Sequence, residues 1–335
     1  MNGVLIIDKP AGLTSHDVVN RVRRILGQRS VGHLGTLDPM ATGVLPLVTG
    51  NFTRLAQFYI SSEKTYEGTV RFGFGTDTYD AEGEPTSEPT NVTLNPNELE
   101  AAAGKFRGVI AQTPPPFSAK KIKGVPAYKL ARKQKEVTLQ PVQVEIKELE
   151  VLGVDVDRMR FRARVSSGTY LRSVAHDMGK ALGCGAHLER LRRTSVAEFT
   201  IAEAHRLEEV AASAGKPDGL SGPRAEASAS LQGGTAVGIA ERSGEGGATM
   251  TAAPPAEKRE VMHELLVHPR TLLPQMPCVT ADELTAARIR AGRTVNLPEL
   301  SRARQVKVFV GQRDLIAIAT RVAGTLFHPK IVLCG

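Results

Sequence analysis

Two spacings of apolar residues predict the strands of this chain. Continuous apolar runs are typical of buried strands, and they occur at residues 4–7 and 44–48. Strict alternation predicts a strand with two different faces, and it occurs at residues 69–75 and 157–165. In the second alternating stretch, four arginines lie on one face, opposite Met159, Phe161, Ala163 and Val165.

Helical spacing marks three further stretches, at residues 15–26, 171–182 and 261–269. The first has Thr14 or Ser15 as its N-cap and Gly27 as its stop. Arg172 lies in the first turn of the second, where the helix dipole disfavours a cation unless a carboxylate offsets it. We therefore expect an acidic partner for Arg172.

The last part of the chain reads as a small separate module. A helix is predicted at residues 281–291 and a hairpin at 306–320, around a turn at 311–314. We therefore expect two domains, 1–276 and 277–335, within an α+β fold. Inside the first domain, residues 213–258 contain no aromatic residue, and 28 of the 46 are Gly, Ala, Ser or Pro. Such a composition predicts a disordered low-complexity insertion.

The charge of the chain indicates a polyanionic partner. The net charge is +8, and residues 213–258 carry four basic and five acidic side chains, so the rest carries +9. The N-terminus lacks the pattern of an export signal, and no apolar run approaches the ~18 residues of a membrane span. Three widely spaced cysteines favour reduced thiols over disulfides. We expect a cytoplasmic protein with no membrane partner.

Cofactor motifs are weak throughout the sequence. The pair Gly73 and Gly75 lacks the third glycine of a dinucleotide fingerprint, and an acidic loop at residues 77–82 follows where a phosphate-binding helix should begin. The same loop lacks the ligand spacing of an EF-hand. A Walker-type lysine motif is absent from the sequence. We expect no nucleotide cofactor and no metal.

A basic segment at residues 113–141 is a candidate surface for RNA. It holds seven basic residues and one acid, Glu136, with Phe117 and Tyr128 among them. Basic side chains interleaved with aromatic rings suit an RNA backbone, although a solvated charge run is the alternative for any single lysine.

Asp38 is the candidate catalytic carboxylate. It lies in a loop between Gly35 and Gly43, and Pro39 forces it out of the helical region into an extended conformation. The loop precedes the buried run at residues 44–48, which would fix its position. Judged on the loop alone, a plain turn remains the simpler interpretation.

The loop sequence GHLGTLDPMATGVLPL resembles the catalytic signature of the tRNA pseudouridine-55 synthases of the TruB type, with Leu34 as a small departure. DKPAGLTSHDVVNRVRR near the N-terminus and GTYLRSVAHDMG at residues 168–179 resemble further motifs of that family. By this resemblance the catalytic residues are Asp38, Tyr66, Arg172 and Asp80. The resemblance gives substrate-binding roles to His33, Tyr170, Leu191, Lys120, Lys121, Lys123 and Arg132. We interpret His176 and His187 as structural, because a lone helical histidine usually is.

The resemblance implies a mixed, largely antiparallel catalytic sheet with helices and an RNA-clamping insertion, followed by a PUA-like RNA-binding module. The implied reaction converts uridine 55 in the T-loop of tRNA to pseudouridine without a cofactor, and we expect a monomer that binds the tRNA T-arm. A guide-RNA-dependent synthase of the dyskerin type is one alternative, although such proteins usually carry an extension before the first strand. A non-catalytic tRNA-binding or tRNA-folding protein and a base-releasing glycosidase are the others.

Overall fold

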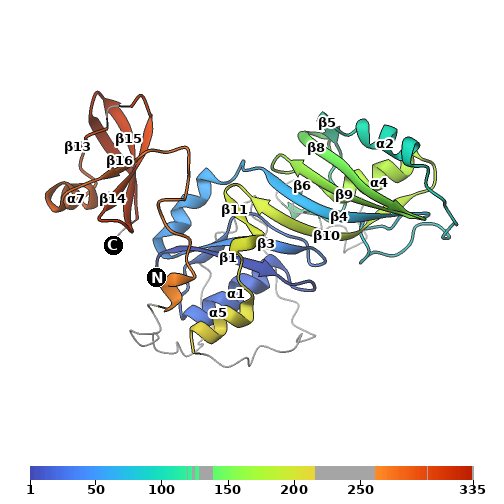
Figure 1. Cartoon of the computed structure of the whole chain (residues 1–335), viewed down its shortest axis with the longest axis horizontal. Coiled ribbons are helices and arrows are strands. Elements are labelled where there is room, and N and C mark those ends of the chain that lie inside the picture. Colours follow the sequence, from blue (N-terminus) through green and yellow to red (C-terminus); the bar gives the residue numbers. More distant parts are fainter. Residues whose placement is uncertain (119, 123–124, 128–138, 216–260, 300, 334–335) are drawn as a thin grey trace.

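Two large sheets with flanking helices and a small two-stranded sheet make up the described part of the protein (Figure 1). The structure is a computed structural model, and it describes residues 1–335 except 119, 123–124, 128–138, 216–260, 300 and 334–335. Among the described helices, none has both the length and the apolar character needed to cross a membrane.

The larger sheet contains nine strands, and its main path runs β1-β3-β10-β4-β9-β8-β5. The strands are β1 (Gly3–Lys9), β2 (Val31–His33), β3 (Thr42–Thr49), β4 (Lys64–Phe72), β5 (Gly108–Gln112), β8 (Val142–Asp155), β9 (Arg158–Val165), β10 (Ala186–Val196) and β11 (Phe199–Thr200). Only the pairing of β3 with β10 is parallel among the described strands of this sheet. The predicted mixed, largely antiparallel sheet is confirmed.

The continuous apolar run in β1 exists because both faces of this strand are covered. Leu5 and Ile7 belong to a core shared with the helices, whereas Val4 and Ile6 belong to a second core. The second core also takes in residues of the C-terminal module, among them Phe309 and several side chains of the later strands. Two-sided burial explains why β1 shows no polar alternation.

Helices flank the larger sheet at two places. They are α1 (Ser15–Leu26), α2 (Pro96–Gly104), α4 (Leu171–Ala181) and α5 (Leu207–Ser213), with 3-10 segments η1 (Gly50–Phe58) and η2 (Ile201–Glu203). In Figure 1, α1 and α5 lie beside β1 and β3, and α2 and α4 lie toward β5 and β8. The predicted caps of α1 are confirmed, since the Thr14 side chain accepts from Asp17 N and Gly27 is left-handed at φ 62°.

The arginine face of β9 is paired with acids from neighbouring strands. Arg158 contacts Glu189 at 2.9 Å, and Arg162 contacts Glu67 at 2.9 Å. Arg164 contacts Glu148 of β8 at 2.5 Å. The predicted alternation is confirmed, because the other face is buried. This face therefore offers less free positive charge than its sequence suggests.

The second sheet has the order β12-β14-β15-β16-β13 and lies wholly after residue 277. Its strands are β12 (Cys278–Thr280), β13 (Val295–Asn296), β14 (Gln305–Val310), β15 (Asp314–Ala323) and β16 (Leu326–Val332), and its helix is α7 (Glu283–Arg290). The predicted hairpin is confirmed as β14 and β15, and the predicted helix begins and ends slightly inside its expected bounds.

The predicted low-complexity insertion falls almost wholly outside the described residues. Its first three residues are described, and here the predicted boundary is wrong: Ser213 ends α5, and Ala214 is 4% exposed and packs in the main core. The helix predicted at residues 261–269 is wrong at its end, because among these residues only 261–264 are helical. Directly after it, Val267 N donates to Val4 O at 2.9 Å, which adds this segment to β1.

The basic segment is described in part. Strands β6 (Lys121–Ile122) and β7 (Val125–Pro126) form a small hairpin. Lys120 is exposed at its start, and the carbonyl of Lys120 accepts from Ala127 N at 2.7 Å. Lys123 and Arg132 lie outside the described residues.

Candidate active site

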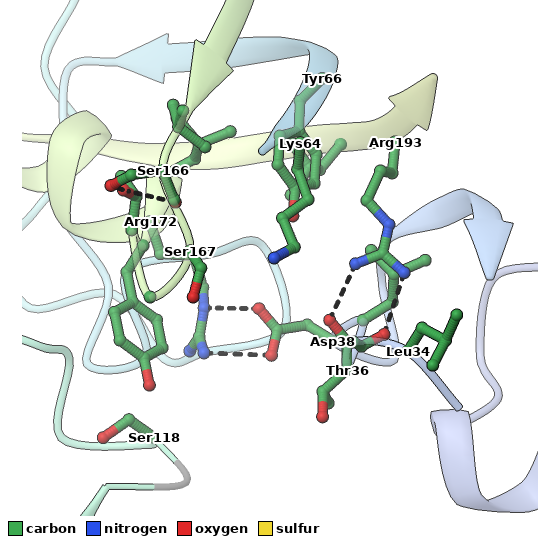
Figure 2. A pocket seen from close by; sticks show the side chains of 18 of the residues that line it. Leu34, Thr36, Asp38, Lys64, Tyr66, Ser118, Ser166, Ser167, Arg172 and Arg193 are labelled. Carbon is green, nitrogen blue, oxygen red and sulfur yellow. Dashed lines mark hydrogen bonds and ion pairs between the residues drawn. The ribbon is translucent and has the colours of Figure 1, made fainter. Parts of the chain in front are cut away.

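A cavity beside the Asp38 loop brings together five of the predicted site residues (Figure 2). Its lining includes Asp38, Tyr66, Tyr170, Arg172 and Leu191. These residues come from a loop, from β4 and β10, and from the start of α4. Five residues spread over more than 150 positions of sequence therefore share one cavity.

The Asp38 loop is tied to the N-terminal part of the chain on both sides of the carboxylate. Before Asp38, the Ser15 hydroxyl accepts from Leu37 N at 2.8 Å. After it, the carbonyl of Pro39 accepts from the buried Lys9 ammonium at 3.1 Å and from Gly12 N at 2.9 Å. These bonds fix the backbone while the Asp38 side chain stays 34% exposed toward the cavity.

Arg172 is the acid-paired cation that its helix position predicts. Its Nη2 donates to Asp38 Oδ1 at 3.2 Å, and its Nε lies 2.9 Å from Asp38 Oδ2. On its other side Nη1 lies 3.4 Å from Asp80 Oδ2. The Arg172 side chain is 5% exposed and also donates to the carbonyl oxygens of Thr78 and Phe117. Two carboxylates thus offset a buried cation at the unfavourable end of a helix.

Asp80 supports Arg172 from outside the cavity lining. Its side chain is 6% exposed and accepts hydrogen bonds from the Thr78 hydroxyl at 2.6 Å and from Glu82 N at 3.1 Å. The preceding residue, Tyr79, has a left-handed φ of 66°, and its ring stacks on His176 with the centroids 3.8 Å apart. A bulky residue rarely adopts this φ, so the turn that presents Asp80 is strained.

Aromatic and apolar side chains line the cavity beside the carboxylate. Tyr66 and Leu191 are both nearly buried and lie on the paired strands β4 and β10. Tyr170 comes directly before α4, and its backbone N donates to the Gln112 side chain at 2.8 Å. Burial, together with the charge of Asp38, raises the pKa of the Tyr170 phenol. The cavity thus offers flat apolar surfaces next to a carboxylate, as a planar base would need.

His33 lies behind the loop and does not line the cavity. It is buried, and its Nδ1 accepts from Gly35 N at 3.3 Å. Burial, with the positive charges of Arg193 and His16, lowers the pKa of His33 to about 4. A direct substrate contact for His33 therefore needs a movement of the loop.

Two basic residues of the cavity were not predicted from the sequence. Arg193 of β10 is fully buried, and its guanidinium donates to the carbonyl oxygens of Gly35, Thr36 and Val44. Lys64, at the start of β4, points into the cavity between Asp38 and Arg193 (Figure 2). The period-two spacing from Leu191 to Arg193 is a signal that both face the same side.

Within the described residues, no group of three or more His, Cys, Asp and Glu side chains is arranged to hold a metal ion. The charged groups of the cavity are the Asp38 carboxylate, Arg172 paired with it, Lys64 and Arg193, and aromatic side chains lie beside them. An ionised carboxylate held by a cation can act as a nucleophile or as a base toward a bound molecule.

Comparison with known proteins points to one family. The family model "TruB family pseudouridylate synthase (N terminal domain)" matches residues 23–171, and "tRNA pseudouridylate synthase B C-terminal domain" matches residues 172–218. A protein of Solibacter usitatus called tRNA pseudouridine synthase B is 45% identical, over 99% of this chain and 100% of its own. One of the same name from Aquifex aeolicus is 50% identical over 62% of this chain and 73% of its own.

Solved structures agree with the fold. A chain in a crystal structure of a Cbf5-Nop10-Gar1 complex matches 99% of this chain and 85% of its own, with a TM-score of 0.63 and 22% sequence identity. A chain in a Nop10-Cbf5 complex of an archaeal box H/ACA sRNP matches with a TM-score of 0.59 and 21% identity. These likenesses show the fold, and the sequence matches over the whole length show the family. The chain belongs to the TruB family of pseudouridylate synthases.

Proposed function

We propose that the chain converts uridine 55 in the T-loop of tRNA to pseudouridine, with Asp38 as the catalytic carboxylate. The observation that carries this proposal is the pairing of Asp38 with Arg172 at 2.9 Å in a cavity that leaves the carboxylate accessible. The pairing holds the carboxylate in a fixed orientation toward the cavity, as nucleophilic or basic chemistry requires. The family and the full-length relative support the reaction.

The reaction is an isomerisation. The bond between C1′ of the ribose and N1 of uracil breaks, the uracil turns within the cavity, and C5 bonds to C1′. C5 loses a proton and N1 gains one, so the reaction needs no electron carrier. The base must first leave the T-loop stack, at a cost on the order of a few kcal/mol. Tyr66, Tyr170 and Leu191 enclose the place where the base would sit.

Arg172 and Asp80 act as one unit in this proposal. Arg172 orients Asp38, while Asp80 keeps the guanidinium in place from the buried side. Tyr66 is the candidate surface for stacking and for the transfer of the C5 proton. Arg172 donates to Phe117 O, which holds the start of the basic segment beside the cavity, and the exposed Lys120 three residues later would bind a phosphate.

We also propose that residues 277–335 form a second RNA-binding domain and that one copy of the chain is sufficient for activity. The separate sheet after residue 277 supports the first point. The second is supported by the cavity, because one copy brings together Asp38, Arg172 and the aromatic side chains that the proposed reaction uses.

The test is incubation of the chain with unmodified tRNA and no other RNA, followed by measurement of pseudouridine and of free uracil. We expect pseudouridine at position 55 only. A requirement for a second RNA would favour the guide-dependent alternative, and free uracil would favour a glycosidase.

Asp38→Asn tests the role of the carboxylate, because it keeps the size of the side chain and removes its charge. The variant should bind T-arm RNA like the parent and form no pseudouridine with enzyme in excess. Asp155→Asn, at an exposed position at the end of β8, is the matched control and should keep the parental rate. A parental rate for Asp38→Asn would overturn the assignment.

A further inference from the structure

The cavity contains two cations that lack an acidic partner. Arg193 uses its guanidinium on three backbone carbonyls, Val44 O at 2.8 Å, Gly35 O at 3.0 Å and Thr36 O at 3.1 Å. Lys64 Nζ donates to Ser62 O at 2.6 Å. In the described part of the chain, neither side chain forms an ion pair within 4.0 Å, whereas Arg172 has two acidic partners.

The two cations lie close together on one wall. A side-chain carbon placed on Gly35 would meet Arg193 Nη1 at 3.6 Å and the Lys64 Cε at 3.7 Å, so both side chains pack against the same glycine. Asp38 is the single acid among the described lining residues, against Lys64, Arg172 and Arg193. Together with Asp80 outside the lining, these groups carry three positive and two negative charges, which leaves a net +1.

Such an arrangement is costly unless an anion completes it. Two like charges in a partly dry cavity repel each other, and each loses hydration. Burial and the charge of Arg193 lower the pKa of Lys64 to about 8. A lysine that packs its stem beside a buried arginine and turns its ammonium toward the cavity is therefore poised to bind an anionic group that arrives with the ligand (Figure 2).

We propose that Lys64 binds the phosphodiester next to the nucleotide that enters the cavity, with Arg193 adding positive potential behind it. This inference rests on the proposed function, since it takes RNA as the ligand. Uracil is neutral, so the anionic groups of the ligand are its phosphates. The two flanking phosphates are attached to the same ribose whose C1′ carries the uracil. Lys64 and Asp38 line the same cavity, so a group that reaches Asp38 brings a phosphate near Lys64. A compact ammonium with two remaining donors suits a phosphate oxygen.

The test is a cycle of protein and RNA changes. Binding of T-arm RNA is measured for two proteins, the Asp38→Asn variant and the double variant Asp38→Asn with Lys64→Gln. Asp38→Asn is present in both so that no turnover occurs. The RNA has either natural linkages or one neutral methylphosphonate, placed 5′ or 3′ of the target uridine. Lys64→Gln should raise Kd about tenfold on natural RNA, as expected for a hydrogen bond to a charged group. On RNA with the neutral linkage at the contacted position, it should change Kd less than about twofold.

Salt dependence and catalysis give independent readouts. Lys64→Gln should reduce the slope of log K against log salt by about 0.7–0.9, the value of one phosphate contact. The Lys64→Gln variant that keeps Asp38 should have a single-turnover rate, at saturating enzyme, within about threefold of the parent, because the contact acts in binding. Lys105→Gln, which removes an exposed lysine after α2, is the matched control and should leave Kd and slope unchanged.

Three results would overturn the proposal. Additive effects of Lys64→Gln and the neutral linkage at both positions would show that they do not interact. A loss confined to the saturating rate, with Kd unchanged, would place Lys64 at the uracil instead. If Lys64→Gln fails to fold, Lys64→Arg replaces it, and equal binding of natural and neutral RNA by that charged variant would refute the contact. The parent is assayed for pseudouridine on the same natural RNA, so a failure of the proposed function is recognised separately.

Discussion

Replacing Arg193 by Met tests whether a buried cation holds the loop that carries Asp38. The guanidinium joins Gly35 and Thr36, before Asp38, to Val44, after it. Each hydrogen bond from a charged donor contributes about 1.5–3 kcal/mol, so three contribute about 5–9 kcal/mol. The desolvation of a guanidinium without a carboxylate opposes this by several kcal/mol. We expect Arg193→Met to lose a net ~2–4 kcal/mol of unfolding free energy.

The same change should reach the chemistry through the position of Asp38. Without the hydrogen bonds of Arg193, the loop would move and displace the Asp38 carboxylate. A displacement near 1 Å costs about 100-fold in rate. Urea unfolding measures the first effect. Single-turnover formation of pseudouridine, with enzyme in excess and below the melting temperature of the variant, measures the second.

Arg192→Met is a matched control on the same strand. Arg192 is half-buried and pairs with both carboxylate oxygens of Asp8, at 3.0 and 2.8 Å, a partly exposed contact that contributes about 1 kcal/mol. Arg193→Lys should lose more stability than Arg192→Met and less than Arg193→Met, because lysine keeps the charge but lacks the planar fork that reaches three carbonyls. The role of Arg193 in holding the Asp38 loop is refuted if Arg193→Met loses no more stability than Arg192→Met, or if Arg193→Met keeps the parental rate.

Three further predictions concern the site and its surroundings. Arg172→Lys keeps a charge beside Asp38 but loses the fork to Asp80, so its single-turnover rate should fall nearly as far as that of Asp38→Asn while T-arm affinity is retained; a parental rate would contradict this. His33 has a folded-state pKa of about 4, below the ordinary 6.5, so the unfolded chain binds the extra proton and stability should fall by about 3 kcal/mol as pH drops from 6.5 to 4. In urea titrations across that window His33→Gln should show a flatter profile, and a profile parallel to that of the parent would exclude His33 as the group. Deletion of residues 216–258 with a short Gly/Ser bridge should leave melting temperature and rate nearly unchanged, because the segment is poor in apolar residues; a large loss of either would disprove this.

The site residues that could be predicted are those whose own neighbourhood carries a signal. Asp38 is forced out of helical conformation by Pro39, and Arg172 lies where a helix disfavours a cation. The position of Arg172 in the first turn of a helix calls for an acidic partner, and the residues around Arg172 in the sequence do not identify that partner. The structure supplies Asp38 and Asp80, 134 and 92 positions away, which the family resemblance lists with Arg172 among the catalytic residues.

Arg193 escaped prediction because its partners are backbone atoms. A run of basic residues such as the one at the end of β10 is typical of a solvated surface. The backbone carbonyls of a distant loop, which bind Arg193, cannot be recognised from the pattern of side chains. Strand β10 itself was missed for a related reason. Its register shifts between Leu188 and Arg190, and again between Arg193 and Ser195, interrupt the alternation that identifies a strand.

The basic face of β9 shows a different limit. The alternation of this strand predicts correctly which residues are buried, but the acids that pair with its arginines lie on strands β4, β8 and β10. Charge counted along the sequence therefore overstates the free positive surface of the folded protein. Sheet order decides which charges meet, and sheet order is a long-range property.

The two-sided burial of β1 has a consequence for the order in which the chain becomes structured during synthesis. Val4 and Ile6 belong to a core completed by residues near the C-terminus, and the Asn2 side chain donates to the carbonyl of Leu333, 331 positions away. A ribosome adding about 5–20 residues per second would release these partners tens of seconds after β1 itself. Until then this core of the first strand holds only its earlier members, such as Phe52 and Leu55, so the N-terminal strand, although made first, is among the last to be completed.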